Sequence, residues 1–256
     1  MINIERCLDR INYQGSREPS LETLKALQLA FVYAIPFENL DIHLQRKIEL
    51  SAENSYRKII DERRGGFCYE CNTLFHSMLE MLGFDVKFVA ATMQLPIAMN
   101  IEFEHMALMV RLDDVYLVDV GNGQSCQQAM RIGADEIVKF ENVEYRLDEF
   151  EDGHALYFRG EGDDWLPRFS FTTVPRQLKE YEEMCHIIQT SPASHFTHRK
   201  VITIARPDGR VSLVDRDLEI KQAGRVTTRS LKSNEQYKES LETYFSIQLP
   251  ELPKSW

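Results

Sequence analysis

Apolar residues follow a helical period in the first third of the chain. Ser20 stands where a helix N-cap belongs, and Pro36 ends the apolar pattern that follows it. Residues 35–40 are expected to form a turn, because the residue before a proline avoids helical geometry. A second helical pattern stops at Gly83, a residue typical of C-caps, and its apolar positions are Leu74, Phe75, Met78, Leu79 and Leu82. Residues 1–83 are therefore predicted to be mainly helical.

From residue 84 the apolar residues alternate instead, which is typical of strands. Residues 84–94 are the first predicted strand. Two further pairs of predicted strands flank polar turns and are expected to form hairpins: 105–112 with 115–120, and 155–159 with 168–173. Antiparallel strands of this kind favour a small barrel or sandwich.

The last part of the chain mixes both patterns. Pro175 opens a predicted helix over 176–189, which leads to two hairpins at 201–214 and 219–227. Ser233 then begins a final helix that reaches about Phe245. The order of elements predicts an α+β fold in three domains: 1–83 helical, 84–190 a β-barrel with its connecting helix, and 191–256 mixed α/β.

Composition and charge narrow the class of protein. A formal net charge of −10 over 256 residues argues against nucleic acid as a general partner, because phosphate binding requires a basic face. No apolar run approaches the length of a membrane span, and the first residues do not resemble a secretory signal. Five cysteines, an odd number, favour free thiols in a reducing compartment, so a cytoplasmic location is expected.

Candidate chemistry centres on residues 64–72, Arg-Gly-Gly-Phe-Cys-Tyr-Glu-Cys-Asn. Cys68 is expected near the N-terminus of the predicted helix, whose partial positive charge favours a thiolate. A lone cysteine is more often a small buried residue, so its position alone does not establish a nucleophile. Cys68 and Cys71 also have the spacing of a redox pair or half a zinc site. No second pair stands at metal spacing, and no metal is expected.

A cysteine nucleophile needs a base and a group that orients the base. Among seven histidines, His105 is unusual because it begins a strongly apolar strand, and Asp119 interrupts the apolar run on the other arm of the same hairpin. Each would need a partner if buried. A two-residue turn would pair Asp119 with Leu108 and place His105 on the opposite face. The pair therefore requires an odd-length loop, a bulge, or Asp119 beyond the regular pairing.

Together Cys68, His105 and Asp119 would form a thiolate–imidazolium–carboxylate set. Asn72, one helical turn after Cys68, is expected to brace it through its side-chain amide. These residues indicate acyl transfer through a thioester. They do not decide between hydrolysis, transglutaminase-like exchange and acetyl transfer.

Six short motifs follow one another along nearly the entire chain: Arg10–Tyr13, Pro36–Asn39, Arg64–Asn72, His105 at the head of its strand, Val118–Gly121 and Ser191–Phe196. Their residues and their order resemble the arylamine N-acetyltransferase family. The resemblance implies a helical bundle, a β-barrel and an α/β lid, with Cys68 in the cleft. It also implies acetyl-CoA as donor, ping-pong chemistry, and an arylamine, arylhydrazine or N-hydroxyarylamine as acceptor. Glu38 is expected to pair with Arg10 as part of the scaffold.

The matched motifs also suggest binding residues. Phe37 would line the acceptor pocket, and Ala193 and Ser194 would approach coenzyme A. Asn122 stands where many family members have phenylalanine, so a roomier or more polar acceptor pocket is expected. The alternatives are a thiol hydrolase or transglutaminase-like acyltransferase with the same three residues, and a catalytically silent relative that binds CoA or a xenobiotic. The intact Cys-His-Asp set argues against the silent relative.

Overall fold

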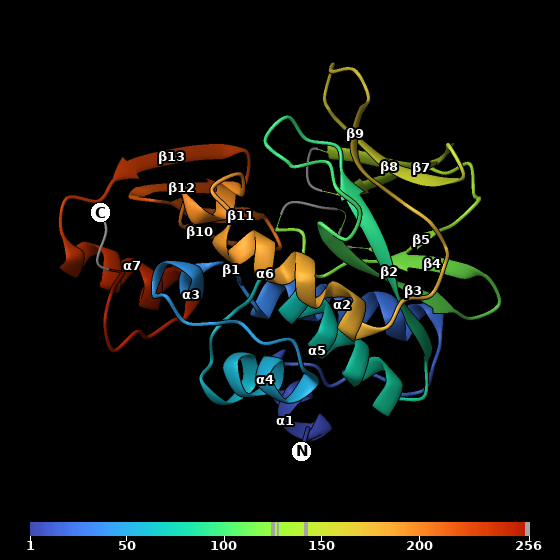
Figure 1. The fold of residues 1–256 in the computed structure, drawn as a ribbon, viewed down its shortest axis with the longest axis horizontal. Helices are drawn as coiled ribbons and strands as arrows, with labels where there is room; N and C mark the ends of the chain where they lie inside the picture. The colour runs from blue at the N-terminus through green and yellow to red at the C-terminus, as the bar shows by residue number, and fades with distance from the viewer. Residues whose placement is uncertain (124–125, 127, 141–142, 254–256) are drawn as a thin grey trace.

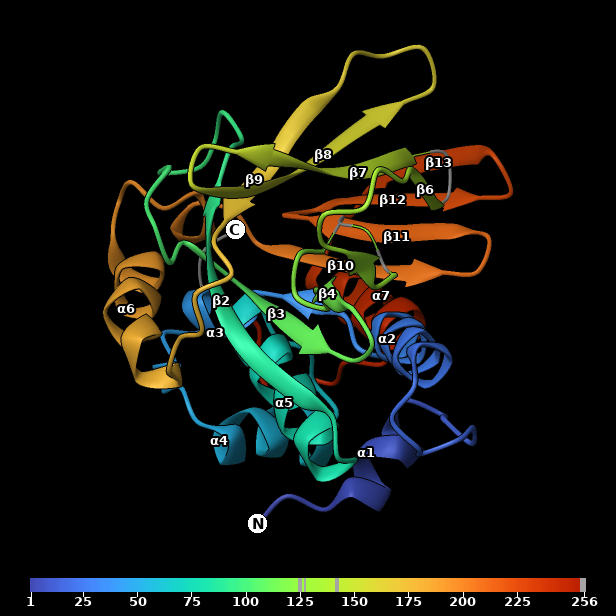
Figure 2. The ribbon, with the colours of Figure 1, turned by 90° about the vertical axis from the view of Figure 1, so that its right-hand side faces the viewer.

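The computed structural model describes residues 1–123, 126, 128–140 and 143–253. Two antiparallel sheets lie next to each other above a layer of N-terminal helices (Figure 1). The eight-stranded sheet curls into a nearly closed barrel, and Figure 2 shows it beside the smaller, five-stranded sheet above the helices. The predicted mixture of helices and antiparallel sheets is confirmed. Among the described helices, none combines the length and the apolar character needed to cross a bilayer.

The N-terminal helices are arranged largely as predicted. The Ser20 hydroxyl accepts the Thr23 N–H at 3.1 Å and caps its helix. Gly83 follows the end of the helix that begins at Cys68, and its φ of +87° is a left-handed conformation that glycine adopts without steric cost. The elements are α1 (Ile4–Arg10), α2 (Leu21–Ala34), α3 (Leu40–His43), α4 (Ala52–Tyr56), one π-helical turn (Arg57–Asp61) and α5 (Cys68–Met81). The apolar face of α5 is fully buried in the main core.

The barrel sheet contains both predicted hairpins, β3–β4 and β8–β9, and also three strands, β5 to β7, that were not predicted. Each strand pairs antiparallel with its neighbours in the sheet, and a second core fills the barrel. In sheet order the strands are β5 (Met130–Arg131), β4 (Val115–Val118), β3 (His105–Arg111), β2 (Asp85–Met93), β9 (Leu166–Phe171), β8 (Gly153–Gly160), β7 (Val143–Phe150) and β6 (Val138–Phe140).

The connecting helix begins later than predicted. A 3₁₀ turn (Leu178–Tyr181) precedes α6 (Glu182–Thr190), and a second 3₁₀ turn (His195–Thr197) follows it. Arg176 does not join the helix, because its N–H donates to the Phe88 carbonyl of β2 at 2.9 Å in an isolated antiparallel bridge.

The smaller sheet corrects the prediction of a simple turn at 35–40. Phe37 and Glu38 form a short strand, β1, which pairs with Thr203 and Ile202 of β10. A segment of the expected helical domain therefore belongs to the C-terminal sheet. The sheet order is β1 (Phe37–Glu38), β10 (Val201–Arg206), β11 (Gly209–Val214), β12 (Asp217–Gln222) and β13 (Arg225–Ser230), and α7 (Asn234–Phe245) shares its apolar core.

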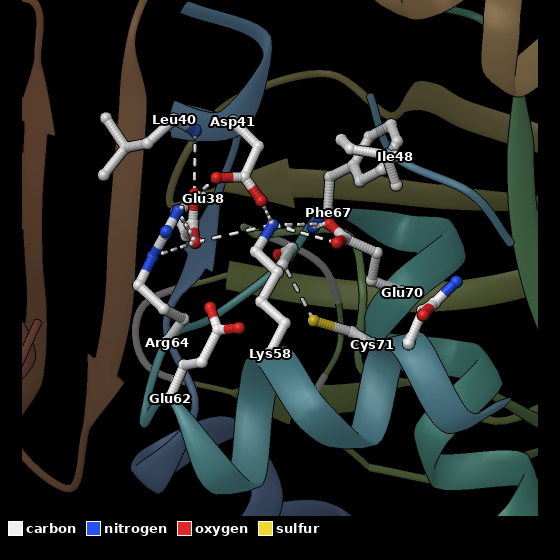
Figure 3. A network of polar contacts seen from close by, with 12 residues as sticks. Glu38, Leu40, Asp41, Ile48, Lys58, Glu62, Arg64, Phe67, Glu70 and Cys71 are labelled. Atoms are coloured by element: carbon white, nitrogen blue, oxygen red, sulfur yellow. Dashed lines mark hydrogen bonds and ion pairs between the residues drawn. The ribbon is translucent and has the colours of Figure 1, made fainter. Parts of the chain in front are cut away.

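A buried cluster of charges lies where β1, the π-helical turn and α5 meet (Figure 3). Lys58 Nζ lies 2.9 Å from carboxylate oxygens of both Asp41 and Glu70. Arg64 donates to Glu38 at 2.7 Å and to Asp41 at 3.1 Å. With all groups ionised, three carboxylates face two cations, so the cluster carries an excess negative charge.

The expected pairing of Glu38 with Arg10 is wrong. Arg10 donates instead to the carbonyl oxygens of Ala34 and Ile59, at 2.9 and 3.3 Å. Those carbonyls lie at a helix end and in the π-helical turn, where backbone oxygens need donors from outside the helix. Glu38 takes Arg64 as its partner within the charge cluster.

Removal of Lys58 is expected to destabilise the fold strongly. The Lys58→Met substitution leaves buried carboxylates with too little positive charge, and breaking such a pair costs about 3–5 kcal/mol. Urea unfolding should show this loss. The matched control is Lys47→Met, because Lys47 pairs with Glu49 at the surface, and a change within about 0.5 kcal/mol is expected there. Equal losses in the two variants would contradict the role of the cluster.

The excess negative charge also predicts a pH dependence. Burial raises the pKa of Glu70 to about 7 from an ordinary 4.5, because Lys58 offsets only part of the desolvation, and Glu38 and Asp41 add repulsion. Between these two values the folded state holds a proton that the unfolded state has lost. The contribution of Glu70 to stability is thus present at low pH and is lost as pH rises through about 7.

The Glu70→Gln variant isolates this contribution, because other carboxylates titrate alike in both proteins. Its free energy of unfolding, measured relative to the native chain, should rise by about 2–3 kcal/mol between pH 4.5 and 7. Urea titrations at several pH values measure the difference. A difference that stays constant with pH would show that Glu70 is not the group that holds the proton.

Candidate active site

The loop before α5 places Cys68 by close backbone contacts. The N–H of Gly66 donates to the Pro36 carbonyl at 3.3 Å, and the Gly66 carbonyl accepts the N–H of Glu38 at 3.0 Å. A Cβ on Gly65 would lie 1.9 Å from the Pro36 oxygen, so no larger residue fits that position. The loop therefore runs directly alongside β1, and the chain enters α5 at Cys68, its first residue.

The register of β3 and β4 brings His105 and Asp119 together. Arg111 pairs with Val115, which leaves a three-residue loop instead of the two-residue turn, and β4 ends at Val118. When this register is continued, Asp119 lies two residues from His105 on the same face. His105 Nε2 lies 2.8 Å from Asp119 Oδ2, and both side chains are buried. The loop is of odd length and Asp119 lies beyond the regular pairing, two of the three arrangements that the pair could use.

Asn72 connects this pair to α5. Its side-chain N–H groups donate to the Asp119 carboxylate at 3.1 Å and to the Met106 carbonyl at 2.7 Å. Its side-chain oxygen accepts the Val120 N–H at 3.1 Å. Gly121 packs against the backbone of Cys68, since a Cβ there would lie 2.6 Å from Cys68 Cα. The side-chain amide of Asn72 thus contacts the His105–Asp119 pair at Asp119, as the sequence predicts.

Cys68 and His105 line one cavity of ≈ 270 Å³. The predicted acceptor residues Phe37 and Asn122 line it too. Ala193 and Ser194 do not: Ala193 is exposed and Ser194 is buried, and their binding of coenzyme A stays a prediction. The residues that follow them in the chain reach the cavity instead, and its further lining includes Met93, Leu95, Glu104, Arg168, His195, Phe196 and Arg199.

Electrostatics at Cys68 differ from the expectation based on the helix terminus. Burial raises the pKa of the Cys68 thiol well above its usual range, and the backbone N–H groups of Met106 and Tyr69 offset only part of this effect. The nearby Asp119 carboxylate raises the Cys68 pKa further. By contrast, the pKa of Asp119 is lowered, because His105, Asn72 and the Gly121 N–H outweigh its burial. Burial and the Asp119 charge therefore favour the thiol form of Cys68 over the thiolate.

Arg168 is the residue at the cavity that sequence reasoning missed. It follows Pro167 at the start of an apolar strand, and its guanidinium donates to the Asn122 side-chain oxygen at 2.6 Å. The sequence feature that could have identified Arg168 is the same one that identified His105: a polar side chain at the start of an apolar strand. Among the described residues, no group of three or more histidine, cysteine or acidic side chains is arranged to hold a metal ion.

A family model described as N-acetyltransferase matches residues 20–253. An arylamine N-acetyltransferase of Mycolicibacterium smegmatis is 34% identical over 253 residues, which cover 96% of this chain and 92% of that relative. The chain therefore belongs to the arylamine N-acetyltransferase family.

Solved structures agree with this assignment. The Mycobacterium marinum arylamine N-acetyltransferase in complex with CoA has a TM-score of 0.88 at 31% identity, covering 96% of this chain and 93% of that one. A Bacillus cereus arylamine N-acetyltransferase, described as having a unique Cys-His-Glu catalytic triad, has a TM-score of 0.87 at 27% identity, covering 97% and 100%. The likeness extends over the whole described fold.

Alkylation of Cys68 should depend on His105. If His105 accepts the thiol proton, iodoacetamide will label Cys68 well below about pH 8, despite the burial of the sulfur. In the His105→Gln variant, labelling should shift to a pH at least about 2 units higher, because burial then acts alone. Peptide mass spectrometry across a pH series measures both profiles.

The other cysteines provide internal controls for this experiment. Burial raises the pKa of Cys7, Cys126 and Cys185 to about 12, and that of Cys71 well above its usual value. All four should label more slowly than Cys68. Identical profiles for native Cys68 and the His105→Gln variant would contradict the pairing.

Proposed function

We propose that this chain transfers an acetyl group from acetyl-CoA to an arylamine, arylhydrazine or N-hydroxyarylamine by a ping-pong mechanism. The observation that carries the proposal is the His105–Asp119 pair, 2.8 Å apart, whose histidine shares a cavity with Cys68 at the start of α5. Membership in the family, and a relative solved with CoA, support the donor.

In the first half-reaction, Cys68 takes the acetyl group. Because Nε2 of His105 is hydrogen-bonded to Asp119, Nδ1 is the ring nitrogen that can accept the thiol proton. The Cys68 sulfur then attacks the acetyl carbonyl and forms a tetrahedral intermediate, whose oxygen is stabilised by backbone N–H groups near Cys68. As the intermediate collapses, the bond to the CoA sulfur breaks. The imidazolium returns its proton to that sulfur, so that CoA leaves as a thiol.

In the second half-reaction, an aromatic amine attacks the thioester. Its nitrogen is neutral at pH 7 and uses its lone pair to form the new C–N bond. His105 takes the proton that the amine loses and passes it to the departing Cys68 sulfur, which restores the free enzyme. Asp119 stabilises the imidazolium in both halves, and Asn72 positions Asp119 through its amide.

The proposal extends to the arrangement of the chain. Residues 1–83 carry the nucleophile, 84–190 carry the base and the acid, and 191–256 cover the cavity as an α/β lid. Phe37 contacts the acceptor, and Ala193 and Ser194 approach coenzyme A from the segment that leads into the cavity lining. Five free cysteines support a reducing, cytoplasmic setting.

Incubation with acetyl-CoA is expected to add one acetyl group, on Cys68, as seen by intact-mass and peptide analysis. Transfer to 4-methylaniline should then release it faster than water does, which distinguishes a transferase from a thiol hydrolase. The Cys68→Ser variant should lose roughly 10³-fold or more in kcat.

The matched control is Cys71→Ala, because Cys71 lies three residues away in the same helix and does not line the cavity. It should still acquire the acetyl group on Cys68. Loss of acetylation only in the Cys71 variant, or full activity in Cys68→Ser, would overturn the proposed nucleophile.

A further inference from the structure

A fully buried glutamine, Gln28, connects α2 to the backbone of Asp119. Its side chain lies on the face of α2 that packs into the main core, between Leu24 and Phe31, one helical turn before and after it. The side-chain nitrogen of Gln28 donates to the carbonyl oxygen of Asp119 at 3.2 Å. The two residues are 91 positions apart in the chain, so this bond joins an N-terminal helix to the end of a strand of the barrel sheet.

The side-chain oxygen of Gln28 has no hydrogen-bond partner among the described residues. A buried polar atom without a partner is unfavourable, so packing alone would favour methionine or leucine at this position. The direction of the amide is nevertheless fixed, because a flipped amide would place its oxygen against the Asp119 carbonyl oxygen. What Gln28 supplies to the core is therefore one hydrogen-bond donor, directed at Asp119.

Gln28 and Asn72 hold one peptide group from its two sides. The Asn72 side-chain oxygen accepts the Val120 N–H at 3.1 Å, and this N–H belongs to the same planar unit as the Asp119 carbonyl. In a trans peptide bond the carbonyl oxygen and the amide hydrogen point in opposite directions. One amide from α2 and one from α5 therefore fix the tilt of this peptide plane.

The tilt of the peptide plane decides where the Asp119 carboxylate points. β4 ends at Val118, so regular strand pairing holds the chain before Asp119 but not the chain after it. The carboxylate accepts the Gly121 N–H at 2.8 Å, and that N–H moves with the plane. Because a Cβ on Gly121 would lie 2.6 Å from Cys68 Cα, the same segment also sets the distance between the two halves of the site.

We propose that Gln28 is a positioning residue for acyl transfer at Cys68. Its donor keeps the Asp119 carboxylate oriented toward His105, so that the imidazolium formed when the thiol loses its proton is stabilised. This inference rests on the proposed function, because it adds a residue to the same reaction. Gln28 is not among the described residues that line the active-site cavity, so its removal should change the rate of acetylation and leave the affinity for acetyl-CoA unchanged.

The test replaces Gln28 with methionine, which has nearly the same length but no donor. In Gln28→Met, the rate of Cys68 acetylation at saturating acetyl-CoA should fall about 10-fold, the size expected for one lost buried hydrogen bond, with an unchanged half-saturating concentration. Iodoacetamide labelling of Cys68 should shift to higher pH by about 0.5–1 unit, because a displaced Asp119 stabilises the imidazolium less well. Quenched-flow and peptide mass spectrometry measure the two effects.

Thr23→Val is the matched control on the same helix. Thr23 is also buried, but its hydroxyl pairs with the Ser20 hydroxyl at 3.1 Å, at the start of α2. This variant should keep the native rate of acetylation and the native labelling profile. A general loosening of α2 would instead move the profile in Thr23→Val as far as in Gln28→Met, and that result would overturn the positioning role.

An Asp119→Asn background tests whether Gln28 acts through the carboxylate. The charge is already lost there, so adding Gln28→Met should shift the labelling profile no further. A full further shift, or a native profile in the single Gln28→Met variant, would also overturn the proposal. Labelling does not require acetyl transfer, so it tests Gln28 independently. Failure of the proposed function would appear instead as absence of acetyl-Cys68 in the native chain after incubation with acetyl-CoA.

Discussion

Asp119 connects the barrel sheet to α5, the helix that begins at Cys68, through hydrogen bonds. Its carboxylate bonds to His105 at the head of β3, to the Asn72 amide on α5 and to its own chain at Gly121. A carboxylate so deeply buried would ordinarily favour its neutral form, yet these donors hold its pKa below the usual value. The same charge that positions the His105 ring therefore also joins the barrel sheet to α5.

A second set of charged side chains lies next to the loop that leads to Cys68. Lys58 and Arg64 bind carboxylates from β1, α3 and α5, and Arg64 is itself part of that loop. Such a buried cluster contributes little net stability compared with an apolar core, because desolvation opposes the attraction. The geometry of the cluster is nevertheless specific, because each buried charge has few other groups with which it could pair. This explains why the loop before Cys68, with two consecutive glycines, can still have one defined conformation.

Residue type predicted the contact between His105 and Asp119, but it did not predict every strand around them. His105 and Asp119 were recognisable because a polar group inside an apolar strand needs a partner. Their register was not, because it depends on whether Leu112 belongs to the strand or to the loop, and both fit the pattern. The Arg10 pairing failed for a related reason: several arginines carry the same charge, and only the path of the backbone decides which one meets Glu38. The strand β7 was missed although its apolar residues alternate, because charged residues separate them.

The two-residue strand β1 has a mechanical consequence. One of its edges pairs with β10, and its other edge exchanges hydrogen bonds with the loop of Gly66. The segment that delivers the sulfur is thus, in effect, an additional strand at the border of the C-terminal sheet. A displacement of that sheet would therefore act, through backbone hydrogen bonds alone, on the chain segment that leads to Cys68.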